Sequence, residues 1–157
     1  MKKIFYVVST AMALLFTQTV LAADLNSPVG LWKTIDDVTG KPKAIVEIKE
    51  TSAHALEGTV LKIFPRPGYD QNEVCSECRG PNHNKKIVGM MILEDLRADK
   101  DNPGRWNGGK ILDPKNGKTY KCTIQLASKN QQLNVRGYIG LPLFGRSQIW
   151  NRVDKVE

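Results

Sequence analysis

Cys75 and Cys78, in the stretch VCSECRG, are the residues whose type and spacing most clearly allow chemistry. A C-x-x-C pair can act as a redox couple, supply half of a zinc site or form a structural disulfide. In a thioredoxin-like couple the pair precedes a helix, whose N-terminus lowers the thiol pKa. Here the segment Arg79–Asn82 contains glycine and proline, which disfavours a helix. Covalent haem attachment would need a histidine where Arg79 stands.

A zinc site is the second possibility for this pair. Cys75, Cys78 and His83 would need a fourth ligand, and both Cys122 and His54 are poorly placed for that role. We therefore predict a Cys75–Cys78 disulfide that stabilises a local loop by on the order of 1–2 kcal/mol. A redox-active pair and metal binding remain alternatives. We expect no resident metal or cofactor.

The N-terminus indicates the compartment. It begins with two lysines after the initiating methionine and continues through an apolar stretch, Ile4–Phe16. Small residues then surround Ala22, which is typical of a signal-peptide cleavage site. We expect residues 1–22 to be a signal peptide and residues 23–157 to form one exported domain. Since no cysteine follows Ala22, the protein should not be a lipoprotein, and a Gram-negative host would place it in the periplasm. An oxidising compartment favours the disulfide.

Charge excludes few classes of protein. The formal net charge is +7, and the basic residues are scattered along the chain. No stretch interleaves basic and aromatic residues in the manner of a nucleic-acid site, so we expect no nucleic-acid partner. No second long apolar run follows the signal peptide, so we expect no membrane span after its cleavage. The expected domain has ordinary size and should be a monomer.

Motifs that would indicate an enzyme are missing from the sequence. It contains no G-x-S-x-G, no H-E-x-x-H and no phosphate-binding glycine loop. The adjacent carboxylates Asp36 and Asp37 are better explained by a turn, because aspartate side chains accept hydrogen bonds from the turn backbone. His54 and His83 lie in polar segments and should be exposed. We therefore assign no catalytic residue and expect a protein that is not an enzyme.

Apolar and polar residues alternate along most of the expected domain. Tyr120, Cys122, Ile124 and Leu126, for example, alternate with polar neighbours, which is typical of a strand with one buried face. The same reasoning predicts about eight short strands, at residues 29–36, 43–50, 55–64, 87–96, 106–112, 119–126, 133–139 and 145–152. The fourth is ambiguous between strand and short helix. The pattern predicts an all-β fold, a single antiparallel up-and-down β-barrel whose long loop carries the cysteine pair.

Gly30, Trp32 and Arg152 add a constraint on closure. In a closed up-and-down barrel the first and last strands pair, so Trp32 on one and Arg152 on the other can stack across the end of the barrel. A G-x-W triplet near the start and an arginine near the end resemble the lipocalin and wider calycin pattern.

Longer segments carry a more specific resemblance. They are GLWKTIDDVTGKPKAIVEI (30–48), CSEC (75–78), RWNGGKILDPKNGKTYKC (105–122), VRGYIG (135–140) and GRSQIWNR (145–152). Together they are similar to an exported bacterial family catalogued as domain of unknown function 2147. The resemblance implies a calycin-like barrel with a signal peptide and no assigned activity. Cys75 and Cys78 match a cysteine pair of that family, whereas Cys122 departs from a position usually taken by a small apolar residue.

Binding is the function class that such a barrel favours. A small barrel either fills its interior with side chains or encloses one ligand. We expect a small apolar or amphipathic ligand, lipid-like or fatty-acid-like. The candidate ligand-binding residues are Trp32, Trp106, Tyr120 and Trp150 as aromatic lining, with Lys110 and Arg136 facing an anionic head group. The alternatives are a filled barrel that contacts an envelope protein partner, and a thiol-redox accessory that uses Cys75 and Cys78.

Overall fold

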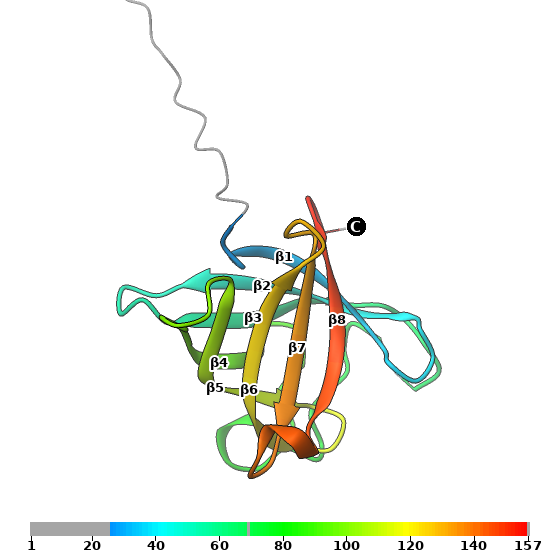
Figure 1. Cartoon of the computed structure of the whole chain (residues 1–157). Helices are drawn as coiled ribbons and strands as arrows, with labels where there is room; N and C mark the ends of the chain where they lie inside the picture. Colours follow the sequence, from blue (N-terminus) through cyan, green and yellow to red (C-terminus); the bar gives the residue numbers. More distant parts are fainter. Residues whose placement is uncertain (1–25, 69, 157) are drawn as a thin grey trace, which may run out of the picture.

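The computed structural model describes residues 26–68 and 70–156, and within them the chain forms a closed antiparallel barrel of eight strands (Figure 1). The strands are β1 Gly30–Ile35, β2 Pro42–Glu50, β3 Leu56–Ile63, β4 Met91–Ala98, β5 Arg105–Asp113, β6 Lys118–Ala127, β7 Gln132–Tyr138 and β8 Arg146–Val153. Two single-turn 3₁₀ helices, η1 Gly80–Asn82 and η2 Pro142–Phe144, lie in the connections. The predicted fold class is confirmed.

Strand order follows the sequence around the barrel, and β1 pairs with β8 to close it. This up-and-down order places the β1–β2, β3–β4, β5–β6 and β7–β8 connections at one end, which we call the mouth. The other connections and the C-terminus lie at the closed end (Figure 1). Within the described residues no helix is long and apolar enough to cross a bilayer. The expected signal peptide, residues 1–22, lies outside the described residues.

The fourth strand begins later than its sequence predicts. Ile87 to Met90 form a turn, in which the backbone N–H of Met90 donates to the carbonyl oxygen of Ile87. Gly89 has φ +90°, a left-handed conformation that is open mainly to glycine. The strand starts only at Met91 because the chain must first complete this turn. The run of apolar residues continues through this turn, so the sequence did not reveal where β4 begins.

Trp32 and Arg152 pair across the seam between β1 and β8, as predicted. The Arg152 guanidinium lies over the indole ring, 4.3 Å from its centroid. It also donates to the carbonyl oxygens of Ser27 at 2.7 Å, Asn130 at 2.9 Å and Val29 at 3.0 Å. One side chain therefore joins the segment before β1, the β6–β7 turn and β8. These contacts lie at the seam where β1 meets β8.

Side chains fill the interior towards the closed end. The buried residues there belong to one apolar cluster: Trp32, Ile48, Leu56, Leu93, Leu96, Cys122, Ile124 and Leu133. Trp32 is fully buried, and its indole N–H donates to the carbonyl oxygen of Pro28 at 2.7 Å, so its polar atom is satisfied. None of these side chains lines the cavity described below. The barrel is thus filled at one end.

Candidate ligand-binding site

The half of the barrel nearer the mouth encloses a cavity of about 320 Å³. Its deeper lining consists of apolar side chains from several strands and from the turn before β4: Val46, Val60, Ile63, Ile87, Ile92, Ile111, Val135 and Trp150. Most of these residues are buried, and Trp150 is only 1% exposed. The volume lies at the lower end of the range of about 300–1,000 Å³ that is common for small-molecule sites. An apolar group can therefore enter the lumen.

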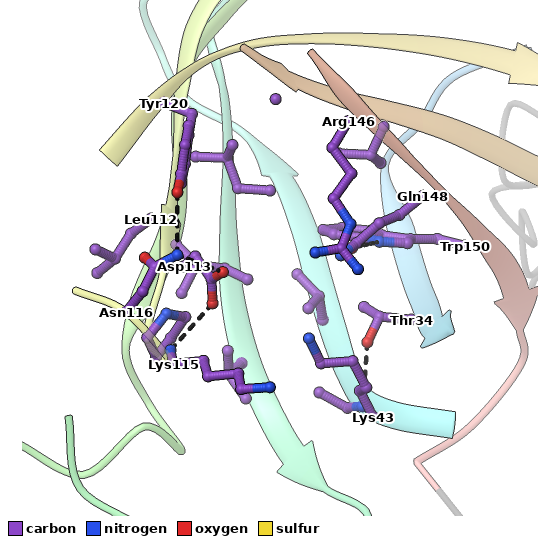
Figure 2. A pocket seen from close by; sticks show the side chains of 18 of the residues that line it. Thr34, Lys43, Leu112, Asp113, Lys115, Asn116, Tyr120, Arg146, Gln148 and Trp150 are labelled. Atoms are coloured by element: carbon purple, nitrogen blue, oxygen red, sulfur yellow. Dashed lines mark hydrogen bonds between the residues drawn. The ribbon is translucent and has the colours of Figure 1, made fainter. Parts of the chain in front are cut away.

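Basic side chains surround the opening of this cavity. Lys43 at the start of β2, Lys115 in the β5–β6 turn and Arg146 at the start of β8 all contribute to the lining. Figure 2 shows the three side chains around the same opening, each reaching in from a different element. Within the described residues neither Lys43 nor Lys115 forms an ion pair with a carboxylate. Both ammonium groups are therefore available to an anionic ligand.

Arg146 is held in place across the mouth by Asp37 of the β1–β2 turn. The guanidinium donates to both carboxylate oxygens, with one N···O distance of 2.6 Å. This hydrogen bonding raises the pKa of Arg146 above its ordinary value. Asp36 stabilises the same turn, as predicted, because its carboxylate accepts from the backbone N–H groups of Thr39 and Val38, and the bond from Thr39 lowers its pKa. The ion pair between Arg146 and Asp37 fixes one side of the opening.

The β5–β6 turn supplies the opposite side of the opening. The Asp113 carboxylate accepts from the backbone N–H of Lys115 at 3.0 Å and from the side-chain amide of Asn116 at 3.2 Å. That amide also donates to the hydroxyl oxygen of Tyr120 at 3.0 Å (Figure 2). Asp113 is consequently engaged in shaping its own turn. The network orients Tyr120 at the edge of the cavity.

A second hollow of about 670 Å³ adjoins the cavity over the β1–β2 turn and the start of the β3–β4 loop. It shares Lys43, Arg66, Asp113, Lys115, Arg146 and Gln148 with the cavity lining. Its further lining includes Phe64 and five residues of the β1–β2 turn, among them Asp36 and Asp37. The opening of the lumen is thus a polar region that continues into an apolar chamber.

Tyr120 and Trp150, two of the six predicted ligand-binding residues, line the cavity. The indole N–H of Trp150 donates to the side-chain oxygen of Gln148 at 3.2 Å, which leaves the ring face as part of the chamber. Trp32 belongs to the filled end, and Trp106 packs against the core cluster from a partly buried position. Neither of these two tryptophans lines the cavity. The structure thus separates the four aromatic candidates into two pairs.

Lys110 and Arg136, the predicted head-group residues, lie outside the cavity lining. Lys110 is exposed because β5 is irregular between Trp106 and Gly109, where Gly108 has φ +76°. Such a bulge reverses the faces of the residues that follow it, so that Gly109 is buried and Lys110 points outwards. Arg136 is directed to the η2 turn, and its partners are described below. The cations at the opening are Lys43, Lys115 and Arg146, with Arg66 beside them.

Sequence reasoning overlooked these cations. Lys43 and Lys115 lie at the margin of a strand and in a turn, where alternation carries no information about direction. Arg146, in contrast, has a usable signal. It precedes Gln148 and Trp150 at steps of two along β8, which assigns all three side chains to one face of the strand.

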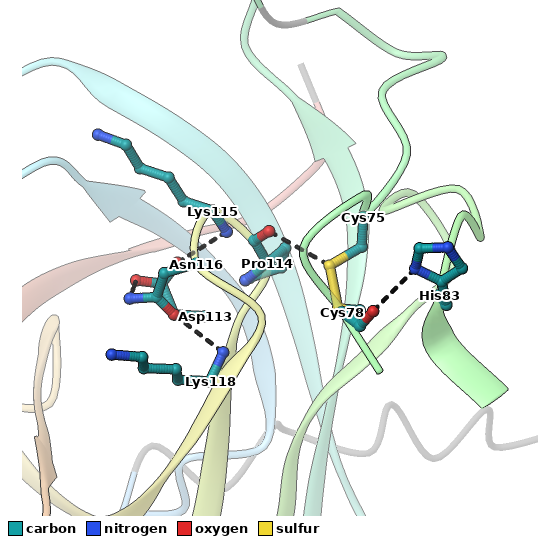
Figure 3. The surroundings of a disulfide bond; sticks show 8 residues. All are labelled: Cys75, Cys78, His83, Asp113, Pro114, Lys115, Asn116 and Lys118. Carbon is teal, nitrogen blue, oxygen red and sulfur yellow. Dashed lines mark hydrogen bonds between the residues drawn. A yellow bond between two sulfur atoms is a disulfide. The ribbon is translucent and has the colours of Figure 1, made fainter. Parts of the chain in front are cut away.

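The Cys75–Cys78 disulfide is present, with an S–S distance of 2.01 Å (Figure 3). Both residues are buried, Cys75 completely. The ring of His83 lies beside the bridge, where its Nδ1–H donates to the carbonyl oxygen of Cys78 at 2.9 Å. Among the described residues no group of three or more histidine, cysteine or carboxylate side chains is arranged to hold a metal ion. The pair forms a buried disulfide bridge.

This disulfide loop packs directly on the β5–β6 turn. The Cys75 sulfur lies 3.2 Å from the carbonyl oxygen of Pro114 (Figure 3). Gly117 ends the same turn with φ +67°, and a Cβ atom there would overlap the carbonyl group of Glu77. The loop also forms a β-bridge between Val74 and Lys86. The disulfide loop therefore packs against the turn that carries Lys115, although neither cysteine lines the cavity.

Cys122 is the free cysteine of the described residues, and it is fully buried. Burial raises the pKa of its thiol from 9.0 to about 12, because a thiolate would lose its hydration there. At neutral pH the group remains a protonated, apolar part of the filled end.

Comparison with known proteins now assigns the family. A family model described as an uncharacterized protein conserved in bacteria, DUF2147, matches residues 30–152. The chain belongs to the DUF2147 family. The matched range starts at Gly30 and ends at Arg152, so it runs from one barrel-closing residue to the other. None of the curated proteins compared with this DUF2147 chain matches it.

A solved structure shares the fold of this DUF2147 protein. Its title states that protein HP1028 from the human pathogen Helicobacter pylori belongs to the lipocalin family. The two structures superpose with a TM-score of 0.66 at 22% sequence identity, and the match covers 80% of this chain and 82% of the other. At this identity the match shows a lipocalin-like fold.

Proposed function

We propose that this protein binds a small amphipathic molecule with an anionic head, such as a fatty acid, inside its barrel. The observation that carries the proposal is the apolar cavity of about 320 Å³ that opens past Lys43, Lys115 and Arg146. The hydrocarbon part would lie against Val46, Val135 and their apolar neighbours, and the anionic head would meet the two lysines. Transfer of an apolar chain from water into such a chamber is favourable by about 25 cal/mol per Å² buried.

A filled barrel that acts only through its surface is less well supported. Such a barrel would continue the close packing of the Trp32 end up to the mouth. A thiol-redox role is also weakly supported, because a cycling disulfide must be accessible to its partner. The sulfur of Cys75 is buried against Pro114.

Export is part of the proposal. Residues 1–22, which lie outside the described residues, have the composition of a signal peptide. The disulfide supports an oxidising compartment, which is the periplasm in a Gram-negative host. Residues 23–157 would then be the mature protein, acting on a ligand outside the cytoplasm.

Competition against dansyl-labelled undecanoate tests the binding of a fatty acid. We expect both dodecanoate and dodecanol to displace the probe from the wild-type protein, dodecanoate more strongly. The double substitution Lys43→Ala/Lys115→Ala should weaken dodecanoate binding about three- to tenfold, because each exposed charge pair contributes up to about 1 kcal/mol. Dodecanol binding should stay the same, since the alcohol carries no charge.

Lys110→Ala is the matched control, because Lys110 is an exposed lysine on β5 that lies outside the cavity lining. It should leave the affinity for dodecanoate unchanged. Failure of the probe and of both competitors to bind would refute the proposal. An equal loss of dodecanoate affinity in the Lys110→Ala protein would refute the assigned position of the head group.

A further inference from the structure

The β7–β8 connection presents an apolar surface to solvent. Its large apolar side chains share a high exposed fraction: Ile139 66%, Leu141 65%, Leu143 80% and Phe144 77%. We name residues 139–144 the apolar tip. Exposed apolar residues are common singly, but a contiguous group marks a surface that contacts another apolar phase or molecule.

Arg136 holds the apolar tip in shape. Its guanidinium donates to the carbonyl oxygens of Pro142 at 2.8 Å and Leu143 at 3.2 Å, and to the Ser147 hydroxyl at 2.8 Å. Carbonyl groups without partners would oppose transfer of the tip out of water, because each unsatisfied group costs free energy in an apolar medium. Their engagement by Arg136 lowers this cost. These hydrogen bonds therefore reduce the cost of moving the tip backbone into an apolar environment. The apolar side chains of the tip meanwhile stay exposed to solvent.

The apolar tip also borders the opening of the cavity. Ile139 and Phe144 contribute to the cavity lining, while Leu143 does not. In Figure 1 η2 projects from the mouth, at the end of the barrel remote from the C-terminus. Lys115 and Arg146 lie on the same rim. A surface that contacts the tip would therefore face the entrance of the lumen.

We infer that the apolar tip docks on an anionic lipid bilayer and turns the mouth of the barrel towards it. Apolar side chains beside cations are the combination that binds the interface of membranes containing anionic lipids. A second copy of the chain fits this surface less well. In a two-fold symmetric dimer the same patch meets itself, so the two copies of Lys115, which forms no ion pair among the described residues, would approach each other. The inference concerns the outer surface and does not depend on the ligand in the lumen.

Vesicle flotation tests this docking. The wild-type protein should float with vesicles of phosphatidylcholine containing phosphatidylglycerol, and should float less with phosphatidylcholine alone or at high salt. Leu143→Ser/Phe144→Ser should lower the partition coefficient more than tenfold, because both side chains would enter the interface. Each protein is purified after export and its N-terminus is checked by mass spectrometry, since an uncleaved apolar segment at residues 4–16 would itself bind vesicles.

Ile149→Ser is the matched control, because Ile149 is 48% exposed on β8 and does not line the mouth. It should float like the wild-type protein. Val135→Phe, which obstructs the lumen, should also float normally, so a failure of ligand binding and a failure of docking are distinguishable. Absence of flotation, or equal losses in the tip and Ile149 variants, would overturn the inference. A tip variant that changes the sedimenting mass of the protein without changing flotation would assign the tip to a contact between copies, and would overturn it too.

Discussion

Arg152 shows how one residue can close a barrel. Its guanidinium stacks on Trp32 and donates to three carbonyl oxygens from separate segments. Gly30 has φ +132°, and a Cβ atom there would lie 3.0 Å from Nη1 of Arg152. A glycine is therefore needed where the arginine crosses the strand. Burial lowers the pKa of Arg152, but the guanidinium remains charged near neutral pH.

Arg152→Lys should lower the free energy of unfolding by about 1–3 kcal/mol, because an ammonium group cannot reproduce the planar fork or its stacking. Arg97→Lys is the control, since Arg97 is exposed and donates a hydrogen bond to the carbonyl oxygen of Ala53 at 2.8 Å. That variant should stay within about 0.5 kcal/mol of the wild-type protein. Urea unfolding measures both. Equal effects would mean that Arg152 has no special role in closure.

At the scale of elements, the β3–β4 loop and the β5–β6 turn form one unit. The disulfide loop occupies the space above Gly117 and contacts Pro114, and this turn carries Lys115 to the opening of the cavity. The role of the disulfide is thus local, as its short ring predicts. It stabilises the loop against the turn, and so maintains one wall of the opening.

Gly117→Ala should destabilise the protein more than Gly40→Ala. Both glycines have nearly the same φ, +67° and +69°, so the backbone strain of an alanine is similar, about 1–2 kcal/mol. A Cβ atom added at Gly40 would have no neighbour within 4 Å, whereas a Cβ atom added at Gly117 would overlap the carbonyl group of Glu77. We expect an additional loss of at least about 1 kcal/mol at Gly117 in thermal or urea unfolding. Dithiothreitol should also reduce the disulfide faster in that variant. Equal stability losses would contradict the packing of loop on turn.

The molecule as a whole is a barrel with two different halves. The end around Trp32 is filled by apolar side chains, and the end at the mouth encloses the cavity. The packed core and the cavity therefore occupy different parts of one lumen. Leu133 and Val135 illustrate the division, because both are buried on β7 two residues apart, but only Val135 lines the cavity.

Substitution of Leu133 or Val135 by phenylalanine should affect stability and probe binding differently, because the two residues lie in different halves of the barrel. Val135→Phe adds volume where space exists, so the free energy of unfolding should change by less than about 1 kcal/mol while probe binding is lost. Leu133→Phe overpacks the filled end and should cost about 1–3 kcal/mol, with binding retained. Urea unfolding and dansyl-undecanoate titration of both variants check this. A large stability loss in Val135→Phe would indicate a filled lumen.

Several features of the fold could be predicted from particular residues. The alternation from Tyr120 to Leu126 identified the strand, although Thr123 on its predicted polar face is also buried. The pairing of Trp32 with Arg152 required the ends of the sheet to meet. These predictions succeeded because a side chain's face depends on its own strand. The same rule would have placed the side chain of Arg146 on the same face of β8 as Trp150.

Only the tertiary structure decided which inward residues line a cavity and which fill the core. Depth along the barrel depends on the register between strands, and a single bulge at Gly108 was enough to direct Lys110 outwards. The Arg136 side chain donates to carbonyl groups of η2. The turn that brings these carbonyl groups to Arg136 has no alternating pattern from which it could be predicted. The sequence by itself therefore determined a closed barrel with a cysteine bridge, because strand faces and end residues are local properties. The open mouth and its basic rim depended on contacts between distant segments.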